Sequence, residues 1–145
     1  MEAAAYNGHT NIVQLLIESG ANVNAQRGKS ITAIQAAAQN GHTHVVELLI
    51  EHGADVDVTG GNWRAAIQAA AFNDNESGTA MEAAAYNGYK DIVQLFIESG
   101  ANINAQGGDL NTAIQAVAQN GHTDVIQLLL GHGADVVAHT GCTTK

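Results

Sequence analysis

The apolar and polar residues of this chain form two kinds of helical pattern, and the second kind follows the first along the chain. The first pattern is short and rich in alanine, as in residues 32–39 and 112–119. It stops at an Asn-Gly pair, and because glycine readily takes a left-handed backbone conformation, we expect a tight turn there. The second pattern places aliphatic side chains at i, i+3 and i+4, which predicts an amphipathic helix. Its first copy uses Ile12, Leu15 and Leu16.

The ends of the second helices carry local signals. Each helix is expected to begin at a threonine that caps it, namely Thr10, Thr43 or Thr123. Each is expected to end at a glycine in the C′ position, namely Gly20, Gly53, Gly100 or Gly133. The sequences that follow, Ala-Asn-Val-Asn or Ala-Asp-Val-Asp, predict an extended turn that crosses to the next pair of helices.

These helix pairs recur at a fixed spacing. Gly8 and Gly41 stand 33 residues apart in equivalent turns, and so do Gly88 and Gly121. A longer duplication overlies this period, because residues 1–8 and 81–88 are identical. One pair of helices cannot bury its apolar face alone, so the periodicity predicts a row of pairs stacked on one another.

The repeated residues resemble the ankyrin repeat. The likeness lies in residues 8–24, which read Gly-His-Thr-Asn-Ile-Val-Gln-Leu-Leu and then Gly-Ala-Asn-Val-Asn, and recurs in residues 41–57 and 121–136. It is similar in detail to the tandem ankyrin arrays of filamentous fungi, which also favour Ala-Gln-Gly-Gly linkers. The resemblance implies an all-α ankyrin-repeat solenoid of stacked helix-turn-helix pairs with short hairpin-like loops.

The chain departs from the family pattern in two places. Thr32-Ala33-Ile34-Gln35 stands where the family has Thr-Pro-Leu-His, which predicts the loss of the hydrogen bonds that the histidine makes. After residues 69–73 no aliphatic second helix follows; the polar residues 74–78 come instead, and a new first helix begins at Thr79. This predicts a lone first helix and a polar loop wedged between two regular pairs, with a local bend or opening of the stack.

We therefore expect a single ankyrin-repeat domain over residues 1–145. Its parts are a partial first repeat (1–26), a second repeat (27–59), a truncated irregular repeat (60–78), a third full helix pair (79–106), a last repeat (107–139) and a tail (140–145). Neither end carries a polar capping repeat. The end faces are expected either to continue into a longer array or to pack against another molecule.

Composition narrows the classes of partner. The formal net charge is −9, which argues against nucleic acid or an anionic membrane surface as the main partner. No apolar run approaches the roughly 18 residues that would span a bilayer. Cys142 is the only cysteine, so an internal disulfide is excluded and an intracellular setting, cytoplasmic or nuclear, is expected.

No residue pattern predicts a cofactor, a metal site or a catalytic centre. One histidine follows the Asn-Gly pair in three repeats, at His9, His42 and His122. Tyr89 replaces it once, so we interpret this position as a turn residue that bonds neighbouring backbone. His44 and His52 lack a third close ligand for zinc, and the acidic residues 74–76 lack the spacing of a calcium loop. An enzyme is therefore the less favoured class.

The candidate binding surface is a concave groove of loop tips and of the solvent side of the first helices. First-helix positions carry Tyr6, Gln39, Phe72, Tyr86 and Gln119. Trp, Tyr and Arg are enriched among residues that dominate interfaces, and two adjacent tips carry basic side chains and the only tryptophan. The predicted binding residues are Arg27, Lys29, Ile31, Trp63, Arg64, Phe72, Tyr86, Leu110 and Asn111. We expect them to bind another protein through an acidic and apolar segment.

Three alternatives remain open from the sequence. Trp63 could instead fold back and fill the space left by the missing helix. The irregular repeat could form a pocket for a small molecule or a reaction, lined by Tyr6, Tyr86, Trp63 and histidine residues. The uncapped ends could drive self-assembly, which would make the chain a structural component or a homo-oligomer.

Overall fold

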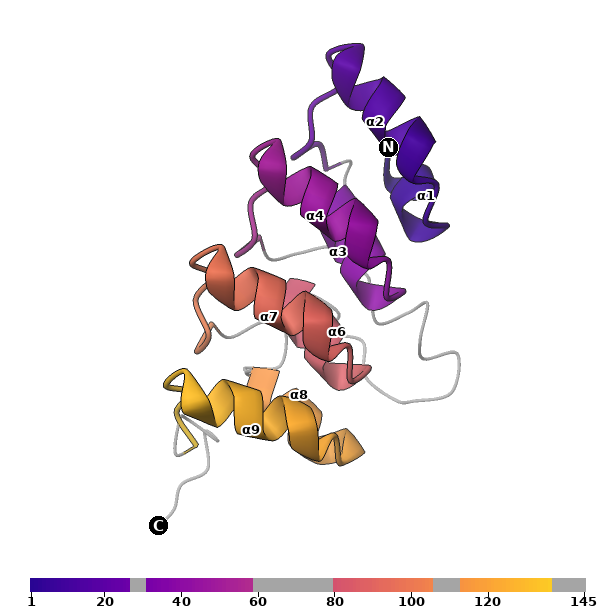
Figure 1. The fold of residues 1–145 in the computed structure, drawn as a ribbon. Helices are drawn as coiled ribbons and strands as arrows, with labels where there is room; N and C mark the ends of the chain where they lie inside the picture. The colour runs from indigo at the N-terminus through magenta and orange to yellow at the C-terminus, as the bar shows by residue number, and fades with distance from the viewer. Residues whose placement is uncertain (27–30, 59–79, 106–112, 137–145) are drawn as a thin grey trace.

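The structure, a computed structural model, describes residues 1–26, 31–58, 80–105 and 113–136 (Figure 1). These residues form eight helices in four consecutive pairs. The pairs are α1 (Glu2–Tyr6) with α2 (Thr10–Glu18), α3 (Ala33–Gln39) with α4 (Thr43–Glu51), α6 (Ala80–Tyr86) with α7 (Lys90–Glu98), and α8 (Ala113–Asn120) with α9 (Thr123–Gly131).

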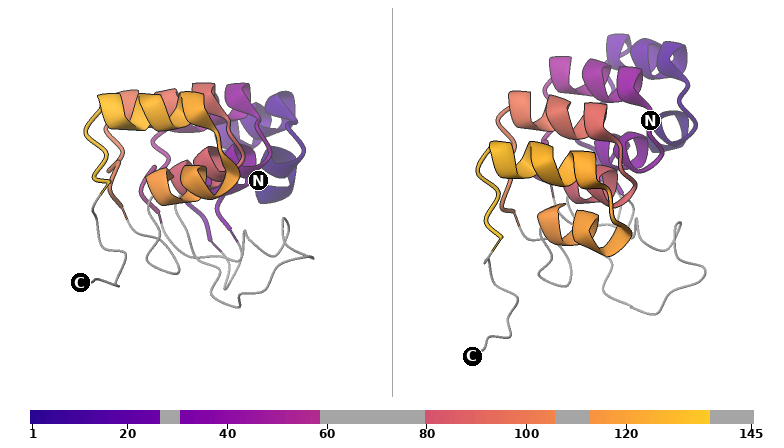
Figure 2. Two further views of the ribbon diagram at one scale, coloured as in Figure 1. Left: turned by 90° about the horizontal axis from the view of Figure 1, so that it is seen from below. Right: turned by 60° about the horizontal axis from the view of Figure 1, so that its bottom comes forward.

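The helices are arranged in two layers. The short first helices α1, α3, α6 and α8 form one layer, and the longer second helices α2, α4, α7 and α9 form the other (Figure 2). Within each layer, every helix packs against the equivalent helix of the next pair. The described part of the chain is all-α, as the repeat pattern predicts, and none of its helices is both long and apolar enough to cross a bilayer.

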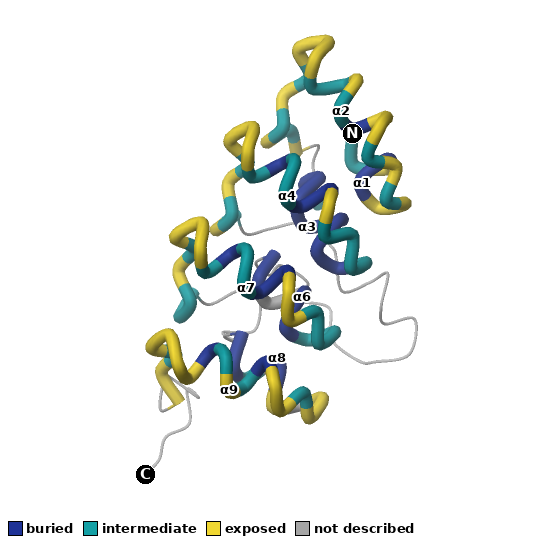
Figure 3. Tube along the Cα trace, viewed as in Figure 1, coloured by how far each residue is buried: buried dark blue, intermediate teal, exposed yellow. Residues whose placement is uncertain are grey.

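The core lies between the two layers (Figure 3). All seven residues of α3 are buried, and Ala36, Ala37 and Ala38 are inaccessible to solvent. Because alanine carries only a methyl group, neighbouring first helices can approach closely. The second helices supply the larger side chains of the core, among them Leu49 and Phe96. The core of the described residues is therefore built mainly from small and aliphatic side chains.

Glycines end both kinds of helix, as expected. After α1, Gly8 has a φ of +72°, its N–H donates to the carbonyl of Ala5, and the N–H of His9 donates to the carbonyl of Ala4. After α2, Gly20 has a φ of +88°, its N–H donates to the carbonyl of Ile17, and the N–H of Ala21 donates to the carbonyl of Leu16. These are Schellman turns, in which glycine takes the left-handed conformation without the strain that a Cβ would add.

The predicted threonine caps of the second helices are wrong. Thr10, Thr43 and Thr123 are the first helical residues, and the cap position falls on the preceding histidine, whose side chain makes no capping bond. A threonine does cap the first helix α3: Thr32 Oγ1 accepts a hydrogen bond from the N–H of Gln35 at 3.4 Å. The N–H of Thr32 in turn donates to Gln35 Oε1 at 2.8 Å, which completes a capping box. Gln35 thus supplies hydrogen bonds of its own where the family's histidine is absent.

We expect Thr32→Ala to lower the free energy of unfolding by about 1–2 kcal/mol, because alanine cannot accept the hydrogen bond from the buried N–H of Gln35. Thr10→Ala removes a threonine that makes no capping bond, so it is expected to change stability by less than about 0.5 kcal/mol. Urea denaturation of the two variants measures the difference. Equal losses would show that α3 does not depend on this cap.

The expected wedge between the second and third regular pairs is also wrong. Helix α3 packs directly on α6, and α4 packs on α7. Asn87 Nδ2 donates to the carbonyl of Gln39 at 3.2 Å, and the N–H of Asn102 donates to Asp57 Oδ1 at 2.8 Å. The physical reason is that α6 presents the same buried alanines as its relatives, so its face fits α3 without a filler. Residues 59–79 themselves lie outside the described part of the chain.

Candidate functional site

Two of the predicted binding residues lie within the described part of the chain. Ile31 is half-buried next to the cap of α3, and Tyr86 is half-buried at the end of α6. The remaining predicted residues lie outside the described residues, so their positions relative to these two stay predictions. They are Arg27, Lys29, Trp63, Arg64, Phe72, Leu110 and Asn111.

The last residues of the first helices form a row across the stack. Tyr6 ends α1 and is exposed, Gln39 ends α3, and Tyr86 ends α6. The expectation that Gln39 faces solvent is wrong, because only 4% of it is exposed. Its side-chain Oε1 is buried and has no hydrogen-bond partner among the described residues. An unpartnered buried acceptor costs about 1–3 kcal/mol, so it marks a place where the fold alone leaves a polar group unsatisfied.

The backbone carbonyls of this row are tied to the following repeat. The Nε2–H of His42 donates to the carbonyl of Tyr6 at 2.9 Å, and the Nε2–H of His122 donates to the carbonyl of Tyr86 at 3.1 Å. Because a carbonyl only accepts, these contacts place the ring proton on Nε2. The interpretation of this position as a turn residue that bonds backbone is confirmed for His42 and His122. The side chain of His9 makes no such bond within the described residues. Sequence reasoning did not show that the bonded carbonyl belongs to the preceding repeat.

The rings at this position also fill the turns. A Cβ added to Gly8 would lie 2.6 Å from a ring atom of His42, and one added to Gly88 would lie 2.6 Å from a ring atom of His122. Tyr89 occupies the same place against Gly41. Glycine is therefore required at these turns for two reasons. It adopts the positive φ, and it has no Cβ that would clash with the ring of the next repeat.

The crossing turns between repeats form a second set of links. Asn24 Nδ2 donates to the carbonyl of Gly53 at 3.0 Å, while Asn24 Oδ1 accepts from the N–H of Asp55 at 2.7 Å. Asn104 makes the same two contacts, to Gly133 and Asp135, at 3.3 and 2.7 Å. Together with the histidine links, these bonds hold neighbouring repeats in one register. The groove is consequently built on a rigid support.

Charge is distributed unevenly over the stack. Acidic side chains lie on the second helices, where Glu18, Glu51 and Glu98 are exposed. His44 Nδ1 lies 3.2 Å from Glu47 Oε2, and His52 Nδ1 donates to the carbonyl of Leu48. Across the described ranges, no three His, Cys, Asp or Glu side chains gather closely enough to hold a metal ion.

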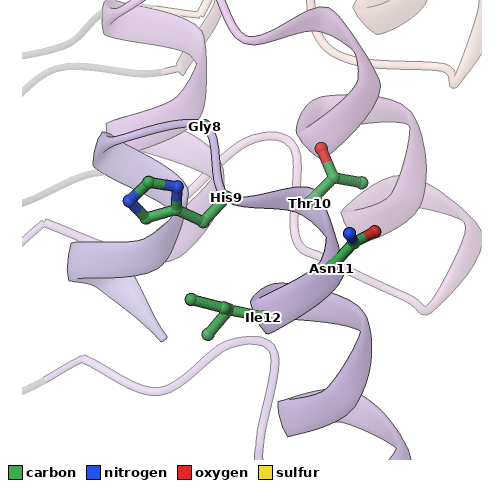
Figure 4. Close-up of a pocket in the computed structure, with 5 residues that line it drawn as sticks. All are labelled: Gly8, His9, Thr10, Asn11 and Ile12. Carbon is green, nitrogen blue, oxygen red and sulfur yellow. The ribbon is translucent and has the colours of Figure 1, made fainter.

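An open hollow of about 520 Å³ lies at the turn between α1 and α2 (Figure 4). It is lined by the consecutive residues Gly8, His9, Thr10, Asn11 and Ile12. The hollow thus belongs to the end of the stack, away from the row formed by Gln39 and Tyr86.

One comparison with known proteins identifies a family. The family model described as ankyrin repeats (3 copies) matches residues 1–107 and 80–144. These ranges together cover almost the whole chain, and they include both regular halves of the duplication. No curated protein matches the chain significantly.

Proposed function

The chain belongs to the ankyrin-repeat family, whose members are generally protein–protein interaction modules, and on that premise we propose that it is a non-catalytic module that binds a partner protein through its groove. The groove consists of the loop tips and the row of residues that end the first helices. Stacked repeats present side chains that are already ordered, so little conformational entropy is lost on binding.

The observation that carries the proposal is the unpartnered oxygen of Gln39 in a row between two tyrosines. Tyr6 and Tyr86 have amphipathic side chains, and tyrosine is a residue type that is enriched at interfaces. On binding, the buried side chain of Gln39 would turn outward, so that an N–H of the partner reaches Oε1, which accepts no hydrogen bond from the described residues. Binding would then remove a cost that the fold alone leaves in place.

We propose that the partner offers an apolar segment with acidic side chains. Its apolar groups would contact the tyrosine rings together with Ile31, Trp63, Phe72 and Leu110. Its acidic groups would face the basic tip residues Arg27, Lys29 and Arg64, and Asn111 would add a polar contact. This local basic patch matters because the body of the protein is acidic overall, with a net charge of −9.

The test uses a random-peptide phage library selected on the wild-type chain. We expect acidic and apolar peptides to be enriched, and the Trp63→Ala, Arg64→Ala double variant to bind a selected peptide about tenfold or more weakly. Glu51→Gln, on the acidic helix layer, is the matched control and should leave the affinity within about twofold. Circular dichroism checks that helical content is unchanged.

Gln39→Leu separates binding from stability. Because it removes a buried acceptor without a partner, it is expected to leave the stability of the fold equal or higher, while the selected peptide binds about fivefold or more weakly. Unchanged affinity in both the double variant and Gln39→Leu would rule out this surface. Enrichment of basic peptides would contradict the proposed partner chemistry.

A further inference from the structure

The first pair of helices exposes apolar positions that are covered in every later pair. Ile12 is 49% exposed, whereas the equivalent residues are buried, namely Val45, Ile92 and Val125. Leu15 is 61% exposed, whereas its equivalents are half-buried, namely Leu48, Leu95 and Leu128. In later pairs these positions face the preceding repeat, which is the side left open here. We call the surface formed by Ile12, Leu15 and the hollow at residues 8–12 the leading face.

The last described pair shows the opposite pattern. Leu130 is 45% exposed, whereas its equivalents are half-buried, namely Ile17, Ile50 and Ile97. Val136 is 63% exposed, whereas its equivalents are half-buried, namely Val23, Val56 and Ile103. These positions face the following repeat in the interior of the stack. We call the surface formed by Gly121, Leu130 and Val136 the trailing face.

The two faces are complementary in detail. At each interior junction, a ring from one repeat lies on the turn glycine of the preceding repeat. The leading face carries His9, the equivalent of those rings, and its side chain makes no hydrogen bond within the described residues (Figure 4). The trailing face carries Gly121 with a φ of +72°, and a Cβ added there would meet no atom within 4 Å. Each face thus offers the half of the junction that the other lacks.

We propose that the leading face of one copy of this chain binds the trailing face of a second copy, head to tail. In this contact the ring of His9 lies on Gly121 of the second copy. Its Nε2–H donates to the carbonyl of Gln119 of that copy, the counterpart of the His42–Tyr6 bond. Ile12 and Leu15 cover Leu130. The hollow of about 520 Å³ receives the Asn120-Gly121 turn of the second copy.

Two features make the contact reversible. Val137 stands where Asn24, Asp57 and Asn104 accept hydrogen bonds from the next repeat, so the crossing-turn link is missing from this contact. The net charge of −9 also repels a second copy. Added salt screens this repulsion, so association should strengthen from low to moderate ionic strength. A head-to-tail contact leaves one leading and one trailing face free, so it extends into a series of oligomers.

Sedimentation velocity over a concentration series up to about 1 mM tests the proposal. The apparent mass of the wild-type protein is expected to rise with concentration from 15.0 kDa towards multiples of that mass. Leu15→Glu on the leading face and Leu130→Glu on the trailing face should each weaken association about tenfold or more, because each places a carboxylate in an apolar contact. An equimolar mixture of the two variants retains one intact face of each kind. It should form a dimer of twice the monomer mass and nothing larger.

His44→Asp is the matched control for charge. It adds a carboxylate to the interior helix α4, at an exposed position where α7 and α9 carry Asp91 and Asp124, and should associate like the wild-type chain. Circular dichroism and thermal unfolding establish that all variants fold. A wild-type chain that stays monomeric throughout overturns the proposal. So does association blocked by only one of the two face variants, which would indicate a symmetric contact, or a mixture that stays monomeric.

Discussion

Phe96→Ala is expected to lower the free energy of unfolding by about 3–5 kcal/mol, the largest loss that a single change in this chain should cause. Phe96 is fully buried in α7 and is the largest fully buried side chain among the described residues. Truncation removes most of its contacts and leaves a cavity between neighbouring helix pairs. Because small domains are stable by only about 5–15 kcal/mol, much of the folded population should be lost on mild heating.

Phe96→Leu is the control that the chain itself suggests. Leu16, Leu49 and Leu129 occupy the same position in the other pairs, so the fold accommodates leucine there. We expect a loss of about 1 kcal/mol, since a large aliphatic side chain still fills most of the space. Urea denaturation gives both values. A cost for Phe96→Ala no larger than that for Phe96→Leu would mean that α7 is not packed as described.

Gly88→Ala is expected to destabilise the chain by about 2–4 kcal/mol, from two separate causes. The φ of Gly88 is +75°, which disfavours any residue with a Cβ. The added methyl group would also lie 2.6 Å from His122 Nδ1 and 2.9 Å from Cγ of the same ring. That ring cannot move aside freely, because its Nε2–H is bonded to the carbonyl of Tyr86. The link between the two repeats should therefore be strained or broken.

Gly121→Ala isolates the second cause. Gly121 occupies the same turn of the next repeat with a φ of +72°, but a Cβ there meets no atom within 4 Å. At low protein concentration, Gly121→Ala should lower the free energy of unfolding by only about 1 kcal/mol, which is the cost of backbone strain at a positive φ. The difference between the two variants then measures the ring contact between repeats. Equal losses for Gly88→Ala and Gly121→Ala in urea denaturation would contradict the role assigned to His122.

The four threonines near helix starts show which local sequence signal identifies a helix cap. Thr10, Thr43 and Thr123 stand two residues before an aliphatic helix position, and so does Thr32, so the presence of threonine alone does not separate them. Thr32 is followed three residues later by Gln35, and this Thr-x-x-Gln spacing is the capping-box signature that the structure bears out. The signal was present in the sequence. The informative feature is the pair of residues, threonine and glutamine, and not the threonine alone.

The candidate site was predictable only in part. The first-helix row follows from the repeat alignment, which placed Tyr6 and Tyr86 correctly at helix ends. The burial of Gln39 could not be predicted, because it depends on how the pairs pack and not on the residue's own position in the repeat. The predicted tip residues Arg27, Trp63 and Leu110 lie outside the described part of the chain, so the complete groove remains a proposal.

The sequence by itself determined the helix pairs, their 33-residue period and the turns at Gly8, Gly41 and Gly88, because helical periodicity and the conformational freedom of glycine are local properties. Only the tertiary structure decided which pairs meet. It placed α3 directly on α6 across a gap in the period, where the sequence predicted a wedge. The reason is that stacking depends on the fit between two faces, and α6 presents the alanine face that α3 accepts wherever it stands in the chain.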